Sequence, residues 1–153
     1  MVTVEGRSGA DIIDLSESCE NIPRLDAVCV KGEEGEDTLS APPEEEMSII
    51  TGITLDGGPD KDSLLGNSGW GTLKGGPGED TILGGEGLDE IDGGADDDEL
   101  LSGGAGEDTI KGDAGNDTIN GDGGNDWLYG GSGDDEILGG IDDDRLFGGP
   151  API

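Results

Sequence analysis

Aspartate recurs at a fixed interval along most of this chain, and carboxylates in such a pattern could bind metal ions. From residue 57 the chain divides into ten units of nine residues, and the sixth residue is aspartate in nine of them. These are Asp62, Asp80, Asp89, Asp98, Asp108, Asp117, Asp126, Asp135 and Asp144, and Gly71 stands at this position in the remaining unit. Carboxylate oxygens are preferred ligands of hard cations such as calcium. The aspartates are therefore candidate metal ligands.

Each unit also has the residues that a turn followed by a short strand requires. Residues 75–83 read Gly-Gly-Pro-Gly-Glu-Asp-Thr-Ile-Leu, in which glycine permits positive φ and close approach of backbones. At the fourth position Asp60, Asp96 and Asp142 replace glycine, and we expect left-handed backbone at these aspartates. The last three residues alternate outward, inward and outward, so one aliphatic side chain per unit should face a core. The inward column is Leu64, Leu73, Ile82, Ile91, Leu100, Ile110, Ile119, Leu128, Ile137 and Leu146, with Ser102 as an inserted residue.

A single unit buries too little to be stable, so we expect two units to form one coil with strands on opposite sides. Alternate aspartates then line one edge of the stack, and the others line the second edge, where Gly71 leaves a gap. Parallel strands about 4.8 Å apart bring the carboxylates of successive coils within reach of one ion. Backbone carbonyls would complete the six to eight oxygens that calcium takes. Four pairs on one edge and three on the other predict about seven calcium ions. The alternative is that the aspartates only form turns on a solvated face, but nine in register favour metal binding.

Residues 57–147 resemble the RTX (repeat-in-toxin, haemolysin-type) calcium-binding nonapeptide family, whose pattern is Gly-Gly-x-Gly-x-Asp-x-aliphatic-x. The resemblance implies an all-β fold, namely a right-handed parallel β-roll, or β-solenoid, with calcium between stacked turns. It also implies a protein that is secreted, extracellular or at the cell surface.

Composition agrees with a chain that needs ions in order to fold. The net charge is −31, from 38 acidic and 7 basic residues with no histidine, and only 30% of residues are hydrophobic. Such a chain alone would be disordered, so we expect folding and calcium binding to be coupled. The charge disfavours nucleic acid and anionic membranes as partners, and no sequence stretch approaches the roughly 20 apolar residues of a membrane span. Without histidine or a nucleophile motif, we expect no enzyme activity.

The first 56 residues follow the repeat only in part, and we expect an irregular N-terminal cap over 1–56 before a regular array over 57–153. Residues 6–14 and 32–40 fit the pattern, which adds Asp11 and Asp37 to the candidate metal ligands. Residues 48–55 should form a strand. A separate small domain is the alternative. Between these pieces, Cys19 and Cys29 favour a local disulfide over free thiols.

The ninth position of each unit should face outward. One face would carry Leu65, Leu83, Leu101, Asn120 and Leu138, and the other Lys74, Asp92, Lys111, Tyr129 and Phe147. The leucines indicate either packing along a sheet or a docking surface. We therefore expect a calcium-folded module of a larger secreted protein, whose partners are calcium ions and the rest of that protein or other copies. The alternative is a self-assembling, calcium-dependent cell-surface, adhesin or matrix protein.

Overall fold

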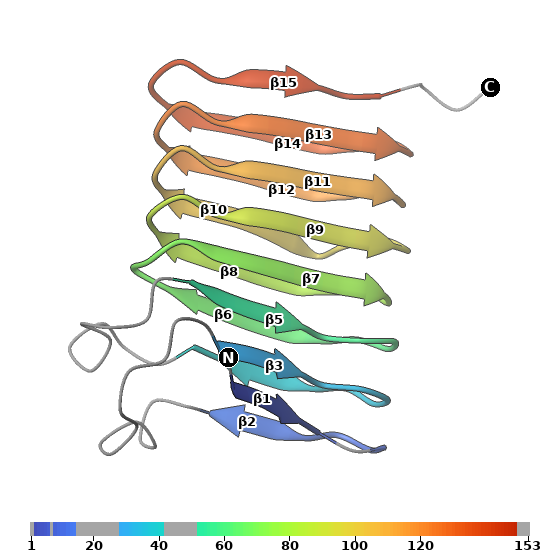
Figure 1. Ribbon diagram of the computed structural model, residues 1–153. Coiled ribbons are helices and arrows are strands. Elements are labelled where there is room, and N and C mark those ends of the chain that lie inside the picture. Colours follow the sequence, from blue (N-terminus) through green and yellow to red (C-terminus); the bar gives the residue numbers. More distant parts are fainter. Residues whose placement is uncertain (1, 7, 15–27, 42–51, 150–153) are drawn as a thin grey trace.

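Two parallel β-sheets face each other across a narrow core in this chain, which is described here from a computed structural model. The structure describes residues 2–6, 8–14, 28–41 and 52–149. None of these residues is helical, so they contain no helix that could cross a membrane. Figure 1 shows the coils stacked on one another from the N-terminal end to the C-terminal end. The predicted all-β parallel solenoid is confirmed.

The strands alternate between the two sheets along the chain. One sheet has the order β1-β3-β5-β7-β9-β11-β13-β15, and the other has the order β14-β12-β10-β8-β6-β4-β2. The strands are β1 (Val2–Glu5), β2 (Ile12–Asp14), β3 (Val28–Lys31), β4 (Thr38–Ser40), β5 (Ile53–Asp56), β6 (Ser63–Asn67), β7 (Gly71–Pro77), β8 (Thr81–Glu86), β9 (Glu90–Ala95), β10 (Leu100–Ala105), β11 (Thr109–Ala114), β12 (Thr118–Gly123), β13 (Trp127–Ser132), β14 (Glu136–Ile141) and β15 (Arg145–Phe147).

Most strands of the regular array are longer than the three residues per unit that the alternation predicts. Strand β8, for example, runs over Thr81–Glu86, which are the last three residues of one unit and the first three of the next. The leading glycines stay in the sheet because their backbone continues to pair with the coil on either side, as Gly85 does with Asn67 and Gly104. The turn is thereby reduced to the middle of each unit.

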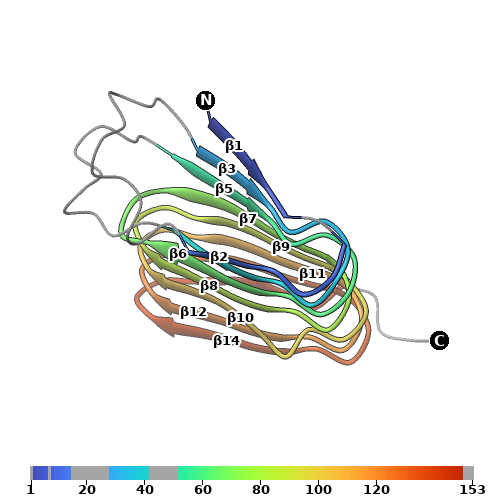
Figure 2. The same ribbon diagram turned by 90° about the horizontal axis from the view of Figure 1, so that it is seen from below.

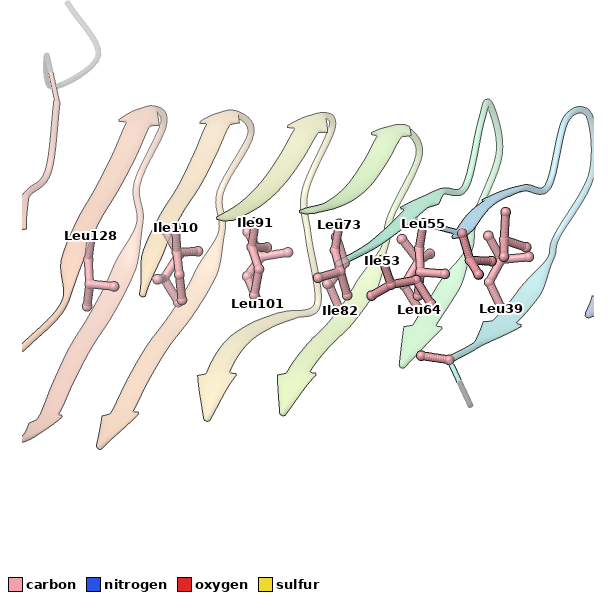
Figure 3. Close-up of a cluster of buried hydrophobic side chains, with 14 residues drawn as sticks. Leu39, Ile53, Leu55, Leu64, Leu73, Ile82, Ile91, Leu101, Ile110 and Leu128 are labelled. Atoms are coloured by element: carbon pink, nitrogen blue, oxygen red, sulfur yellow. The ribbon is translucent and has the colours of Figure 1, made fainter. Parts of the chain in front are cut away.

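The core is a single row of aliphatic side chains between the sheets (Figure 3). Leu64, Leu73, Ile82, Ile91 and Ile110 are all at most 1% exposed. Each stacks on the residue two units away, as Leu73 pairs with Ile91 in neighbouring strands. The row continues through Ile119 and Leu128, and both sheets contribute to it. This inward column was predicted correctly except in the unit 93–101 and in the last strand, where Leu146 pairs with Leu128 but is 47% exposed.

The first exception is the unit 93–101, where the extra residue is not Ser102. Leu101 is fully buried and pairs with Ile82 and Ile119, whereas Leu100 lies opposite Thr81 on the outer face. The Glu99 amide still donates to the Asp80 carbonyl, so two residues of this strand oppose one of its neighbour. This is a β-bulge at Glu99–Leu100. The prediction that placed Leu100 in the core and Leu101 on the surface was wrong.

The bulge also breaks the predicted leucine row on the outer face of the even-numbered strands. Ser102, not Leu101, pairs with Leu83 and Asn120 there. On the opposite face the predicted residues, Lys74 to Phe147, pair in turn from β7 to β15. The rings of Tyr129 and Phe147 stack there with centroids 4.8 Å apart. Trp127 stacks on the same phenylalanine ring at 6.1 Å.

Left-handed backbone occurs where the turns were expected to need it. Asp60, Asp96 and Asp142 have φ of 91°, 80° and 85°. At the second position of a unit, the glycines are required by contact as well as by conformation. Gly104 has φ of 102°, and a Cβ there would overlap the Gly85 carbonyl of the coil below.

The N-terminal strands continue the same two sheets. Strands β1, β3 and β5 pair in sequence below β7, and β2 and β4 pair below β6 (Figure 2). The connections 15–27 and 42–51 lie outside the described residues, as do Cys19 and the first half of the strand predicted over 48–55, whose last three residues lie in β5. The predicted Cys19–Cys29 pairing is therefore not tested; Cys29 itself lies half-buried in β3.

Candidate metal centre

The sixth-position aspartates form two stacked columns, one at each edge of the solenoid. The first carboxylate column lies in the turns that lead into even-numbered strands. It consists of Asp11, Asp37, Asp62, Asp80, Asp98, Asp117 and Asp135. The second carboxylate column lies in the turns that lead into β9, β11, β13 and β15. It consists of Asp89, Asp108, Asp126 and Asp144. All eleven predicted ligands therefore fall into these columns.

From the second member of each column upward, one carboxylate oxygen accepts a hydrogen bond from the turn of the coil below. The Asp62 amide donates to Asp80 Oδ1 at 2.8 Å, and the Asp80 amide donates to Asp98 Oδ1 at 3.0 Å. The same bond joins every neighbouring pair, which gives six steps in the first column and three in the second. Because the bond fixes the side-chain rotamer, the second oxygen of each carboxylate takes a defined direction.

That second oxygen is buried and lacks a hydrogen bond in most of the turns. Oδ2 has no hydrogen-bond partner among the described residues in Asp37, Asp62, Asp80, Asp89, Asp98, Asp108, Asp117, Asp126 and Asp135. A buried carboxylate oxygen without a partner is costly. Nine repetitions of the same unpaired oxygen indicate that something outside the chain satisfies it.

Each of these oxygens lies so close to the first residue of its unit that the Cβ of any residue other than glycine would collide with it. A Cβ on Gly84 would stand 2.6 Å from Asp89 Oδ2 and 2.6 Å from the carbonyl oxygen of Gly103, one coil above. The corresponding carboxylate and carbonyl oxygens both border the position of such a Cβ at six units, namely those starting with Gly6, Gly32, Gly75, Gly84, Gly112 and Gly121. The glycine column therefore leaves a cradle of oxygens between successive coils.

Burial in the two carboxylate columns raises the pKa of several aspartates, which favours their protonated form when no cation is present. Burial raises the pKa of Asp62, Asp89 and Asp98 from 3.8 to about 7. It raises the pKa of Asp108 to about 6, and the neighbouring carboxylate of Asp126 adds to the effect. Backbone hydrogen bonds oppose the shift in Asp62, Asp98 and Asp108, but loss of water outweighs them. A divalent ion would remove this penalty.

The oxygen chemistry fits calcium. Among the described residues, no three acidic or cysteine side chains converge on one point, so a bound ion would draw on stacked carboxylates and backbone carbonyls together. Calcium accepts such a mixed oxygen set with flexible geometry, whereas magnesium demands a strict octahedron and keeps its waters. The absence of histidine from the chain excludes the usual nitrogen ligand of zinc.

Comparison with known families agrees with this geometry. A model of the RTX calcium-binding nonapeptide repeat matches residues 65–100, 96–128 and 120–150, which together span more than half of the chain. The chain belongs to the RTX calcium-binding nonapeptide repeat family. RTX repeats are structural calcium-binding modules and are typical of secreted proteins. Neither the curated proteins nor the solved structures compared with the chain gave a match.

The second carboxylate column ends where the RTX pattern was predicted to fail. Gly71 takes the place of the aspartate, and neither oxygen of Asp89 has a hydrogen bond of good geometry, although the nearby Gly71 amide acts to lower the pKa of Asp89. The space at Gly66 is bordered by the Gly84 carbonyl and by no carboxylate among its nearest atoms. The oxygen set is incomplete at this step.

Sequence analysis missed what lies below Gly71 on this edge. The strand register places Ile53 beside Gly71, and Val28 beside Ile53. Both side chains are buried, at 2% and 4% exposure. Their β-branched side chains within short strands were a sequence signal, but the register across the long connections was needed to align them with the aspartates.

Proposed function

We propose that this chain is a calcium-driven folding and rigidity module of a larger secreted protein and has no catalytic role of its own. The observation that carries the proposal is the column of buried Oδ2 atoms, each without a hydrogen bond and each facing a glycine-lined cradle. Without ions these carboxylates repel one another at a spacing set by the β-sheet. With ions they join successive coils.

The hydrogen-bonded steps support one ion each, which gives nine ions in place of the seven predicted from residues 57–147 alone. The two additional steps join Asp11 to Asp37 and Asp37 to Asp62. Nine divalent ions would contribute +18 against a net charge of −31. The remaining charge is small enough for the few lysine pairs and solvent screening to accommodate a compact state.

The test is circular dichroism and calorimetry on the whole chain after removal of divalent ions. We expect a spectrum without β structure in chelator, a β spectrum in millimolar calcium, and a stoichiometry near nine. Magnesium at the same concentration serves as the control, and we expect it to leave the chain unfolded. The same β spectrum with and without calcium would contradict the proposal.

A second candidate is self-assembly at a cell surface or in a matrix. Its support is the apolar surface of the last two strands, where Leu138, Ile141 and Phe147 are 56%, 72% and 44% exposed. Sedimentation of the calcium-loaded chain would distinguish the two candidates, with Ile141→Ser and Phe147→Ser as disrupting variants. Assembly that both substitutions abolish would support this candidate, and a monomer at all concentrations would exclude it.

A further inference from the structure

The second edge of the solenoid changes its chemistry at Gly71. Above this residue the edge carries the second carboxylate column, which starts at Asp89. Below it, the same column of the strand register holds Ile53 and Val28, both buried in the hydrophobic core. An edge that is closed by apolar packing needs no ion to neutralise it.

The core is correspondingly wider in the coils below Gly71. Strand β3 buries both Val28 and Val30, and β5 buries both Ile53 and Leu55. In the odd-numbered strands above, β9, β11 and β13 bury one aliphatic side chain each, for example Ile110 in β11, and β15 buries none. The lower coils therefore obtain more of their stability from hydrophobic burial.

Carboxylate steps are also fewer in the lower coils. From Asp11 to Asp80 the steps lie on the first edge only, and there are three of them. From Asp80 upward, three steps on the first edge are matched by three on the second. Without calcium, the upper coils therefore hold twice as many buried carboxylate steps.

We propose that calcium folds this chain in two stages, an inference that rests on the calcium-driven folding proposed above. Strands β1–β7, here called the base, become ordered at a lower calcium concentration than strands β9–β15, here called the upper array. The folded base then presents one open edge of each sheet. The upper array adds to these two edges coil by coil, because each coil contacts only its neighbours.

Hydrogen exchange followed by mass spectrometry over a series of free calcium concentrations tests this order on the full chain. We expect amides of β3 and β5 to gain protection at a calcium concentration about tenfold lower than those of β11 and β13, because apolar burial replaces ion binding on one edge. A single midpoint for all strands, or earlier protection of the upper array, would overturn the two-stage order and leave calcium-driven folding intact. Equal protection at every calcium concentration, including none, would instead refute calcium-driven folding and the order with it.

A matched pair of variants separates the apolar edge from the core in general. Ile53→Ala removes an edge residue of the base, whereas Ile110→Ala removes a core residue of the upper array. We expect Ile53→Ala to raise the calcium midpoint of β3 and β5 and so to reduce the gap between the two stages. Ile110→Ala should raise only the midpoint of the upper array and widen the gap. If Ile53→Ala left the midpoint of the base unchanged, the apolar edge would not be the cause of early folding. If that variant did not fold, the order of the two midpoints in the unmodified chain would still decide.

Discussion

Asp98→Asn should have opposite effects on the calcium-free and the calcium-loaded protein. Asp98 is 2% exposed, and burial raises its pKa from 3.8 to about 7. One pKa unit corresponds to about 1.4 kcal/mol, so after allowance for residual screening by water the ionised side chain costs the calcium-free fold on the order of 2–4 kcal/mol near neutral pH. Asparagine keeps an oxygen that can accept the Asp80 amide hydrogen bond and removes this cost.

With calcium present, the same substitution should weaken binding. The amide nitrogen would take the place of Oδ2, which borders the space at Gly93, and would present hydrogens where a cation needs an oxygen. Because calcium affinity follows the number of charged ligands, we expect the midpoint of the calcium titration to rise about tenfold, equivalent to about 1.4 kcal/mol. Circular dichroism during folding by trimethylamine N-oxide without calcium, and during calcium titration, measures the two effects separately.

Asp97→Asn is the matched control, since Asp97 is adjacent and exposed and its replacement changes the net charge equally. Its side-chain oxygen accepts the Asn116 amide, and asparagine can keep that bond. We expect little change in either titration. If Asp97→Asn and Asp98→Asn behaved alike in both experiments, general charge reduction would explain the result, and the assignment of Asp98 as a buried ligand would be wrong.

Protons should partly replace calcium, because burial raises the folded-state pKa of Asp89 from an ordinary 3.8 to about 7. The folded calcium-free chain therefore binds more protons than the unfolded chain, and its stability should fall as pH rises from about 4 to 7. Circular dichroism in calcium-free buffer over this pH range measures this, and a β content that rose with pH would contradict it. Ile119→Ala should lower the free energy of unfolding in calcium by about 2–5 kcal/mol, whereas Ile141→Ala, at a site that is 72% exposed, should leave it nearly unchanged; equal losses in thermal melts would refute the position of the core. Gly104→Ala should prevent close stacking on the Gly85 carbonyl and cost more than about 1 kcal/mol, while Gly148→Ala, where no atom lies within 4 Å of a new Cβ, should be tolerated.

The parts of this fold that follow from one repeat could be read from the sequence. Each unit contains its own turn, its inward aliphatic residue and its aspartate, so position within the unit is enough to place Asp80 and Ile82. The two-unit coil also follows, because a side chain such as Ile82 is buried only when a second strand faces it. The gap at Gly71 was predicted for the same reason: it needs only a comparison of equivalent positions.

Features that depend on more than one coil could not be read in this way. The extra residue in the unit 93–101 fits the repeat equally well before or after Leu101, and only pairing with Ile82 and Ile119 decides that Glu99–Leu100 forms the bulge. The apolar lower part of the second edge depends likewise on the register that connects Val28 with Ile53 across a long segment. Local patterns do not specify such a register.

The coil of two units has a consequence for insertions and deletions. Aspartates joined by the hydrogen bond from a backbone amide to the carboxylate of the next coil are mostly 18 positions apart, as Asp62 and Asp80 are. Loss of 18 residues from the upper coils would shorten the stack by one layer and return every later aspartate to its own edge. Loss of nine residues would move every later unit to the opposite edge. Aspartates of the first carboxylate column would then lie above those of the second, and the reverse. Changes in length by whole coils should therefore be tolerated, whereas changes by single units should break one bonded column and join its remainder to the other.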